Sequence, residues 1–185
     1  IRNVKRNGGQ IIWCEPNQAS RDQTLTKVLD DTDSVLVHPY NDERIICGQG
    51  TAALELMEKN PDLDIIITPV SGGGLLGGTL CYTKEKNKNI QIYGAEPMEA
   101  DDAYRSLLSG KIQSNETTNT ICDGLRAQIG TITFPIIREK VNGIIPISEE
   151  DIISTMQMIW ERMKIIVEPS CSIVLAAVLN NKKIF

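Results

Sequence analysis

The sequence lacks the features that mark several classes of protein. It has no apolar run near the ~20 residues that a membrane-spanning helix needs, since its longest runs are segments such as 65–67 and 172–179. It has no excess of basic residues, because its net charge is −5, so no nucleic-acid partner is expected. It does not open with a charged and then apolar signal segment, and we expect a cytoplasmic protein.

Cysteine and histidine also occur without the spacing of a metal site. The five cysteines include no Cys-x-x-Cys pair and are scattered over positions Cys14, Cys47, Cys81, Cys122 and Cys171. Each lies in or beside an apolar stretch, which favours buried, reduced thiols over a disulfide framework. The only histidine, His38, directly precedes Pro39, and we expect it to be structural rather than an acid–base group.

What the sequence contains is typical of a globular protein. Its 185 residues, 41% hydrophobic and 23% charged, allow one large domain, or one domain plus part of another. Segment 1–9 has the basic residues and the Gly8 that are typical of the end of a helix. Residues 184–185 resemble the start of a new element. We therefore expect an internal piece of a longer protein; the alternative is a natural terminus with frayed ends.

Apolar patterning predicts helices that alternate with short strands. Strands are expected at 10–15, 34–38, 64–70, 89–96 and 143–147. Helices are expected at 20–31, 49–59, 101–109, 134–141, 148–163 and 172–179, and one more helix follows a glycine-rich loop and ends near residue 86. Ser20 and Ser148 are expected to be N-caps. This alternation indicates an α/β fold with a mostly parallel sheet and helices on both faces. Ligands in such folds bind beyond the carboxyl ends of the strands.

The glycine-rich loop, residues 71–78, joins the third predicted strand to a helix. Consecutive glycines allow backbone N–H groups to turn toward one centre, and the following helix adds its positive N-terminal end. This pattern predicts a phosphate site; the alternative is a tight turn without a ligand. The spacing Gly72-x-Gly74-x-x-Gly77 also satisfies the dinucleotide fingerprint, with Glu96 at roughly the 20-residue distance of the ribose-binding acid. An NAD-binding domain is therefore an alternative.

Four carboxylates lie close together after the fourth strand, within residues 96–102. Glu96 ends the strand, and Asp101 and Asp102 lie at the start of a helix. Glu96, Asp102 and an intervening carbonyl could bind one cation with oxygen ligands, a set that suits Mg²⁺, Ca²⁺ or Mn²⁺. The alternative is simple capping of the helix by Asp101.

Together these motifs resemble the serine racemase and serine/threonine dehydratase group of fold-type-II pyridoxal-phosphate enzymes, which are tryptophan synthase β-like in fold. The matching residues occur in the order of the family and cover nearly the whole chain. They are Cys14-Glu-Pro, Ser20-Arg21, Val37-His38-Pro39, Gly48-Gln-Gly-Thr, Pro69-Val-Ser-Gly-Gly-Gly74, Ala95-Glu96-Pro97, Ala100-Asp101-Asp102, Asp123-Gly124, Trp160-Glu-Arg-Met-Lys164 and Glu168-Pro169-Ser170. The resemblance makes the NAD-binding alternative much less favourable.

The resemblance implies a role for each matching group of residues. The cofactor, pyridoxal 5'-phosphate, would be bound by Ser71, Gly72, Gly73, Gly74, Gly124 and Glu168. The substrate would lie beside Arg21 and Asp123, and a divalent cation would be bound by Glu96, the carbonyl of Ala100 and Asp102. Arg162 would match a position near an ATP effector site at a dimer interface; the alternative is an exposed arginine that pairs with Glu161.

The sequence also departs from the pattern of the family. No lysine has the sequence context of the lysine that carries the cofactor, and the serine on the opposite cofactor face is likewise absent, so no catalytic residue is assigned. Ser71 stands where many relatives have glycine, but its N–H stays available. Tyr40 after His38-Pro39 resembles the threonine dehydratases more than some racemases. Residues 1–185 alone are expected to be inactive.

The resemblance therefore implies a function for the whole protein. It would be a homodimeric pyridoxal-phosphate enzyme that racemises serine and also dehydrates it to pyruvate and ammonia. Residues 1–41 would be the remainder of a small domain, and residues 42–185 part of a large cofactor-binding domain. The alternatives are a threonine/serine ammonia-lyase and a truncated, non-catalytic homologue.

Overall fold

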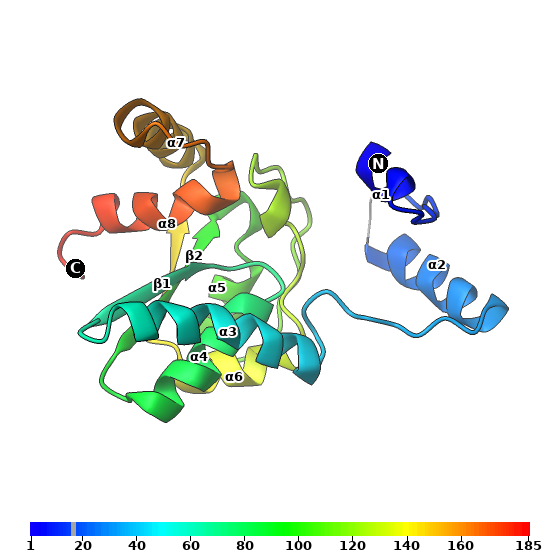
Figure 1. Cartoon of the computed structure of the whole chain (residues 1–185), viewed down its shortest axis with the longest axis horizontal. Helices are drawn as coiled ribbons and strands as arrows, with labels where there is room; N and C mark the ends of the chain where they lie inside the picture. Colours follow the sequence, from blue (N-terminus) through cyan, green and yellow to red (C-terminus); the bar gives the residue numbers. More distant parts are fainter. Residues whose placement is uncertain (16–17) are drawn as a thin grey trace. The chain divides into compact units, whose positions relative to one another are not determined.

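The computed structural model describes residues 1–15 and 18–185, which form two compact units, Ile1–Val37 and His38–Phe185. The first unit contains helices α1 (Arg2–Arg6) and α2 (Gln18–Asp31) (Figure 1). Gly8 follows α1 with a φ of 79°, the left-handed conformation that the sequence predicts. The boundary at 41/42 between the domains of the whole protein stays a prediction.

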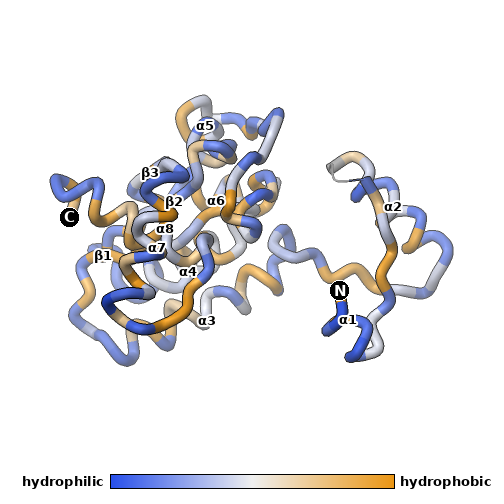
Figure 2. The backbone as a smooth tube through the Cα atoms, turned by 90° about the horizontal axis from the view of Figure 1, so that it is seen from above, coloured by the Kyte–Doolittle hydropathy of each residue, from blue (hydrophilic) through white to orange (hydrophobic). Residues whose placement is uncertain are grey.

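Two strands predicted for the first unit are wrong. Residues 10–15 and 34–38 form no strand, because no described segment pairs with them, and a strand needs a neighbouring backbone for its hydrogen bonds. The apolar stretch 35–37, which is orange in Figure 2, is accordingly exposed, with Val35 81% accessible. Ser20 is not an N-cap either, since α2 begins at Gln18; its hydroxyl accepts the N–H of Glu15 (3.0 Å).

The second unit is built on a parallel sheet with strand order β1-β2-β3. Its strands are β1 (Ile65–Pro69), β2 (Gln91–Pro97) and β3 (Gly143–Ile147). In this register Pro69 lies opposite Ala95, and Glu96 lies opposite Pro146. The carboxyl ends of all three strands therefore meet at one edge, as the sequence predicts.

Helices precede and follow the strands and cover both faces of the sheet (Figure 1). They are α3 (Glu43–Lys59), α4 (Gly74–Lys86), α5 (Asp102–Ser109), α6 (Thr133–Lys140), α7 (Glu149–Met163) and α8 (Pro169–Asn180), with short 3-10 turns η1 (Met98–Ala100) and η2 (Asp123–Leu125). Ile92 and Ile144 point to a core formed with α4, α5 and α6. Ala95, Ile145 and Ile147 point to a core formed with α7 and α8. The predicted fold class is confirmed.

The exposure of the cysteines contradicts one prediction. Cys122 is buried, but Cys14, Cys47, Cys81 and Cys171 are exposed, and all five are free thiols. Successive residues of a helix point about 100° apart, so an apolar neighbour does not bury a helical cysteine. Cys47 and Cys81, for example, directly follow the buried Ile46 and Leu80. None of the helices in the described part of the chain is long and apolar enough to cross a membrane.

Candidate functional site

The loop between β1 and α4 presents buried N–H groups that have no acceptor. Gly73 is the N-cap of α4, and Gly72, Gly73 and Gly74 are buried. No described residue accepts a hydrogen bond from the N–H groups of segment 71–74. Buried backbone N–H groups are rarely left unpaired, so these groups are available to a ligand that accepts hydrogen bonds at the positive end of α4.

The carbonyl groups of this loop determine where its N–H groups point. The carbonyl oxygen of Gly72 accepts from the Thr133 hydroxyl (2.6 Å) and from the N–H of Gly130 (3.2 Å). The carbonyl oxygen of Gly73 accepts from the N–H of Gly77 (2.8 Å). All described peptide bonds are trans, so the N–H of Gly73 points away from Thr133, and the N–H of Gly74 points away from α4.

Two positions of the loop require glycine. Gly73 has a φ of 88°, and a Cβ there would lie 2.8 Å from Ile129, Ile137 and Thr133. A Cβ on Gly72 would lie 2.3 Å from ring carbons of Tyr40. The close approach of these neighbours excludes larger residues and brings the backbone of the loop into a tightly packed environment.

Ser71 connects the loop to a distant segment. Its hydroxyl accepts from the N–H of Ala127 (3.0 Å) and donates to the carbonyl of the same residue (3.3 Å). The side chain of Ser71 is therefore engaged within the protein, whereas its N–H remains available.

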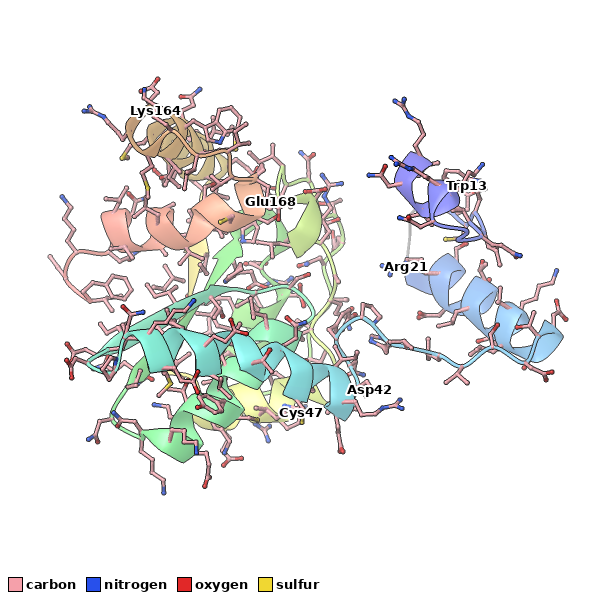
Figure 3. All side chains as sticks on the ribbon, viewed as in Figure 1. Trp13, Arg21, Asp42, Cys47, Lys164 and Glu168 are labelled. Atoms are coloured by element: carbon pink, nitrogen blue, oxygen red, sulfur yellow. The ribbon has the colours of Figure 1, made fainter. Side chains whose placement is uncertain are left out.

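The residues predicted to flank the cofactor ring lie on two elements that contact each other, η2 and the start of α8. The N–H of Gly124, in η2, donates to the hydroxyl of Ser170 (3.3 Å), two residues after Glu168. Glu168 is the exposed N-cap of α8, and its side chain makes no capping hydrogen bond (Figure 3). Asp123 adjoins Gly124 and is exposed. The structure thus brings Asp123, Gly124 and Glu168 into one neighbourhood.

The acidic pair predicted to bind a cation is fully buried. Glu96 and Asp102 are 0% and 1% exposed, and Ala100 is 1% exposed. The Glu96 carboxylate accepts the N–H groups of Ala103 (3.0 Å) and Tyr104 (2.8 Å), so it caps α5 from the end of β2. Asp101 is at the N-cap position of this helix, as the alternative predicts, but its side chain makes no capping hydrogen bond and instead forms an ion pair with Arg105 (2.7 Å).

Burial changes the protonation of both acids. Burial raises the pKa of Glu96 well above its usual range, and the charge of Asp102 adds to this effect. Burial likewise raises the pKa of Asp102 to about 6. Two adjacent buried carboxylates are costly unless a proton or a cation neutralises them. No cluster of three acid, histidine or cysteine side chains suited to a metal occurs among residues 1–15 and 18–185, so a cation here would also need carbonyl and water ligands.

One segment, residues 127–133, connects the acidic pair to the glycine loop. Asp102 accepts the N–H of Ile129 (2.7 Å), and its other oxygen accepts from Asn115 (2.7 Å). The next N–H along the chain, that of Gly130, donates to the carbonyl of Gly72 (3.2 Å). The predicted cation site and the glycine loop are therefore both hydrogen-bonded to adjacent residues of segment 127–133.

Other predicted residues lie outside this network. Arg21 is exposed on α2, in the first unit, and its place beside the substrate stays a prediction (Figure 3). Arg162 is exposed in the last turn of α7, and its effector role likewise stays a prediction. His38 is structural as expected, because its Nδ1 accepts the N–H groups of Asn41 (2.8 Å) and Tyr40 (3.3 Å). Pro16, part of one motif, lies outside the described residues.

The residues that hold the loop in place carry no recognisable pattern in the sequence. Thr133 and Ala127 both bind the glycine loop, and Asn115 binds Asp102. Segment 117–130 has the irregular, polar composition of an ordinary loop, so only the position of Thr133 at the start of a predicted helix could have drawn attention to it.

Comparison with known proteins places these features in a family. All 185 residues match the family described as "Pyridoxal-phosphate dependent enzyme". The chain is 49% identical to a serine racemase of Arabidopsis thaliana, over 98% of the chain and 55% of that protein. It superposes on the structure of maize serine racemase with a TM-score of 0.94 at 44% identity, covering 98% of the chain and 55% of that structure. A threonine deaminase from T.th. gives a TM-score of 0.93 at 34% identity, covering 98% and 61%. The chain thus spans little more than half the length of these relatives.

Proposed function

Because the chain belongs to the family of pyridoxal-phosphate dependent enzymes, we propose that the whole protein is a serine racemase that also dehydrates serine. The observation that carries this proposal is the set of N–H groups at 71–74, at the start of α4, which have no acceptor among the described residues and belong to residues that are buried at 72–74. The 49% identity to a serine racemase supports the choice of substrate. In the dehydration, water leaves serine, and hydrolysis of the product releases pyruvate and ammonia.

The residues of this chain would hold the cofactor and the substrate. The N–H groups of Ser71, Gly72, Gly73 and Gly74 would bind the cofactor phosphate, and Gly124 and Glu168 would flank its ring. When bound, pyridoxal phosphate supplies an electron sink for the α-carbon of an amino acid. Arg21 and Asp123 would orient the amino acid. No lysine here has the context of the one that carries the cofactor, so the remainder of the whole protein would supply that lysine and the serine of the opposite face.

We further propose that Glu96, the carbonyl of Ala100 and Asp102 bind Mg²⁺, Ca²⁺ or Mn²⁺. The supporting observation is the burial of the two carboxylates, because this burial, and after it the charge of Asp102, raises the pKa of Glu96. Oxygen ligands suit these cations, and each carboxylate oxygen has a lone pair beyond its hydrogen bond to an N–H or amide group. A cation would neutralise the pair and hold segment 127–133 beside it.

A homodimer and an ATP effector site near Arg162 complete the proposal. Apolar side chains are exposed at the end of α7 and after it, as expected for a surface that another subunit covers. They are Trp160, Met163, Ile165 and Ile166. We also infer a cytoplasmic location for the whole protein.

A threonine/serine ammonia-lyase is the second candidate function. It is supported by the likeness to a threonine deaminase at a TM-score of 0.93 and by Tyr40, whose ring packs on Gly72. The test is to incubate the full-length protein with L-serine or L-threonine and to measure D-serine by chiral chromatography and the keto acids by a coupled assay. D-serine together with pyruvate is expected. Keto acid without D-serine would favour the ammonia-lyase, and no product from either would favour a non-catalytic homologue.

A further inference from the structure

A buried hydroxyl lies directly behind the glycine loop. Thr133, the first residue of α6, is 0% exposed. Its hydroxyl oxygen accepts the N–H of Gly130 (3.0 Å), which is shared with the carbonyl of Gly72 (3.2 Å). The hydroxyl donates to the carbonyl of Gly72 (2.6 Å), and the carbonyl of Gly130 is a more distant second acceptor (3.2 Å). Since a hydroxyl has one hydrogen, the shorter contact indicates that Gly72 receives it.

The peptide between Gly72 and Gly73 needs such a restraint. Glycine adopts many backbone conformations, so a peptide between two glycines can rotate at little steric cost. In a trans peptide the N–H of Gly73 points opposite to the carbonyl of Gly72, so rotation of this peptide would turn both groups away from their present directions. Gly72, Gly73 and Gly74 have no side chains of their own that could prevent this rotation.

We propose that Thr133 is a positioning residue that aims the N–H of Gly73 at the phosphate of the ligand. It acts through the Gly72 carbonyl and not by contact with the ligand. The position of Thr133 is itself well determined, because Phe134 and Ile137 anchor α6 in the core, at 6% and 1% exposure. The N–H of Phe134 also donates to the carbonyl of Gly130 (2.9 Å), which fixes the start of the helix.

The test uses Thr133→Val, which keeps the shape of the side chain and removes the hydroxyl. This inference rests on the proposed binding of pyridoxal phosphate, so the full-length protein is titrated with pyridoxal phosphate and, separately, with pyridoxal, which lacks the phosphate. Loss of one hydrogen bond that orients the site is expected to weaken binding of pyridoxal phosphate about tenfold. Binding of pyridoxal stays unchanged, and the ³¹P resonance of the bound cofactor shifts.

Two matched variants serve as controls. Thr133→Ser restores the hydroxyl and is expected to restore the affinity. Thr131→Val removes a hydroxyl of the same segment that accepts from Asn41 (3.0 Å) and does not touch the loop, and is expected to bind like the natural protein. If Thr133→Val does not fold, Thr133→Cys replaces it, since a thiol is a weak donor of similar size.

The possible outcomes separate the inference from the function on which it rests. Equal affinity of Thr133→Val and the natural protein for pyridoxal phosphate would overturn the inference. Equal weakening for pyridoxal and pyridoxal phosphate would show a merely structural role and would also overturn it. If the natural protein does not bind pyridoxal phosphate, the proposed function fails first.

Discussion

Gly73 shows how one residue combines two requirements. Its φ of 88° is unfavourable for residues with a side chain, and its three neighbours leave no room for a Cβ. Gly110, after α5, shares the first requirement only, since its φ is 72° and a Cβ there would meet no atom within 4 Å. The pair therefore separates backbone strain from steric exclusion within one protein.

Gly73→Ala is expected to lower the free energy of unfolding by more than Gly110→Ala does. Gly110→Ala should lower it only by the roughly 1–2 kcal/mol that the left-handed backbone conformation costs an alanine. It should also weaken binding of pyridoxal phosphate at least tenfold, because relief of the clash displaces the N–H groups. Urea denaturation and absorbance titration measure the two effects. Equal stability of the two variants would contradict the steric argument.

The buried acids lead to a prediction for divalent cations. At pH 7.5, Mg²⁺ or Ca²⁺ is expected to raise the Tm of the natural protein, and Asp102→Asn is expected to abolish the response. Glu99→Gln, which changes an exposed acid of the same cluster, should leave the response normal. A response that survives in Asp102→Asn would place the cation elsewhere.

The same pair has a defined pH dependence without added cation. The pKa of Asp102 in the folded protein is about 6, above its ordinary 3.8. Its contribution to stability is therefore fully present below about pH 3.8 and is lost as the pH rises through 6. Protons compete with a cation, so the gain in Tm from Mg²⁺ should shrink as the pH falls from 7.5 to 5. Calorimetry over this range measures both trends, and a gain that grows toward pH 5 would refute the site.

At the scale of elements, the start of α7 is determined by its own sequence. Ser148 is the N-cap, its hydroxyl accepts the N–H of Asp151 (3.2 Å), and the same hydroxyl donates to the Asp151 carboxylate (2.7 Å). Acids at 149–151 also suit the positive end of the helix. This local arrangement is the one that the sequence predicts.

Ser148→Ala is expected to lower the free energy of unfolding by about 1 kcal/mol, because it removes this cap. Ser154→Ala, inside the same helix and exposed, is the matched control. It should be neutral or slightly stabilising, since alanine has the higher helix propensity. Chemical denaturation compares the two, and equal effects would show that the cap contributes nothing.

At the scale of the whole molecule, parallel strands bring separate loops to one edge. The loop after β1 and the acids after β2 are adjacent because the carboxyl ends of the strands are aligned. A ligand in the glycine loop binds only the folded chain. Pyridoxal phosphate at a hundredfold excess over its Kd should therefore stabilise the protein by about 2.7 kcal/mol. Thermal unfolding in the presence of pyridoxal phosphate or of NAD measures this stabilisation. Stabilisation by NAD alone would support the NAD-binding alternative.

Local patterns in the sequence were sufficient for much of the second unit. The alternation of apolar segments predicted β1, β2 and β3, and the run of glycines predicted the loop between β1 and α4. Local patterns were insufficient to predict the structure of residues 10–15 and 34–38, whose apolar composition resembles that of strands. Whether such a segment forms a strand depends on a neighbour, which composition does not reveal.

The sequence by itself determined the order of the strands in the second unit, the glycine loop and the family, because each depends on residues close together in the chain. The tertiary structure alone decided what orients that loop. Ser71 meets Ala127 across 56 residues, and Gly72 meets Thr133 across 61. Hydrogen bonds over such separations leave no periodic signal, since only the packing of segment 127–133 and α6 beside α4 brings their partners within reach.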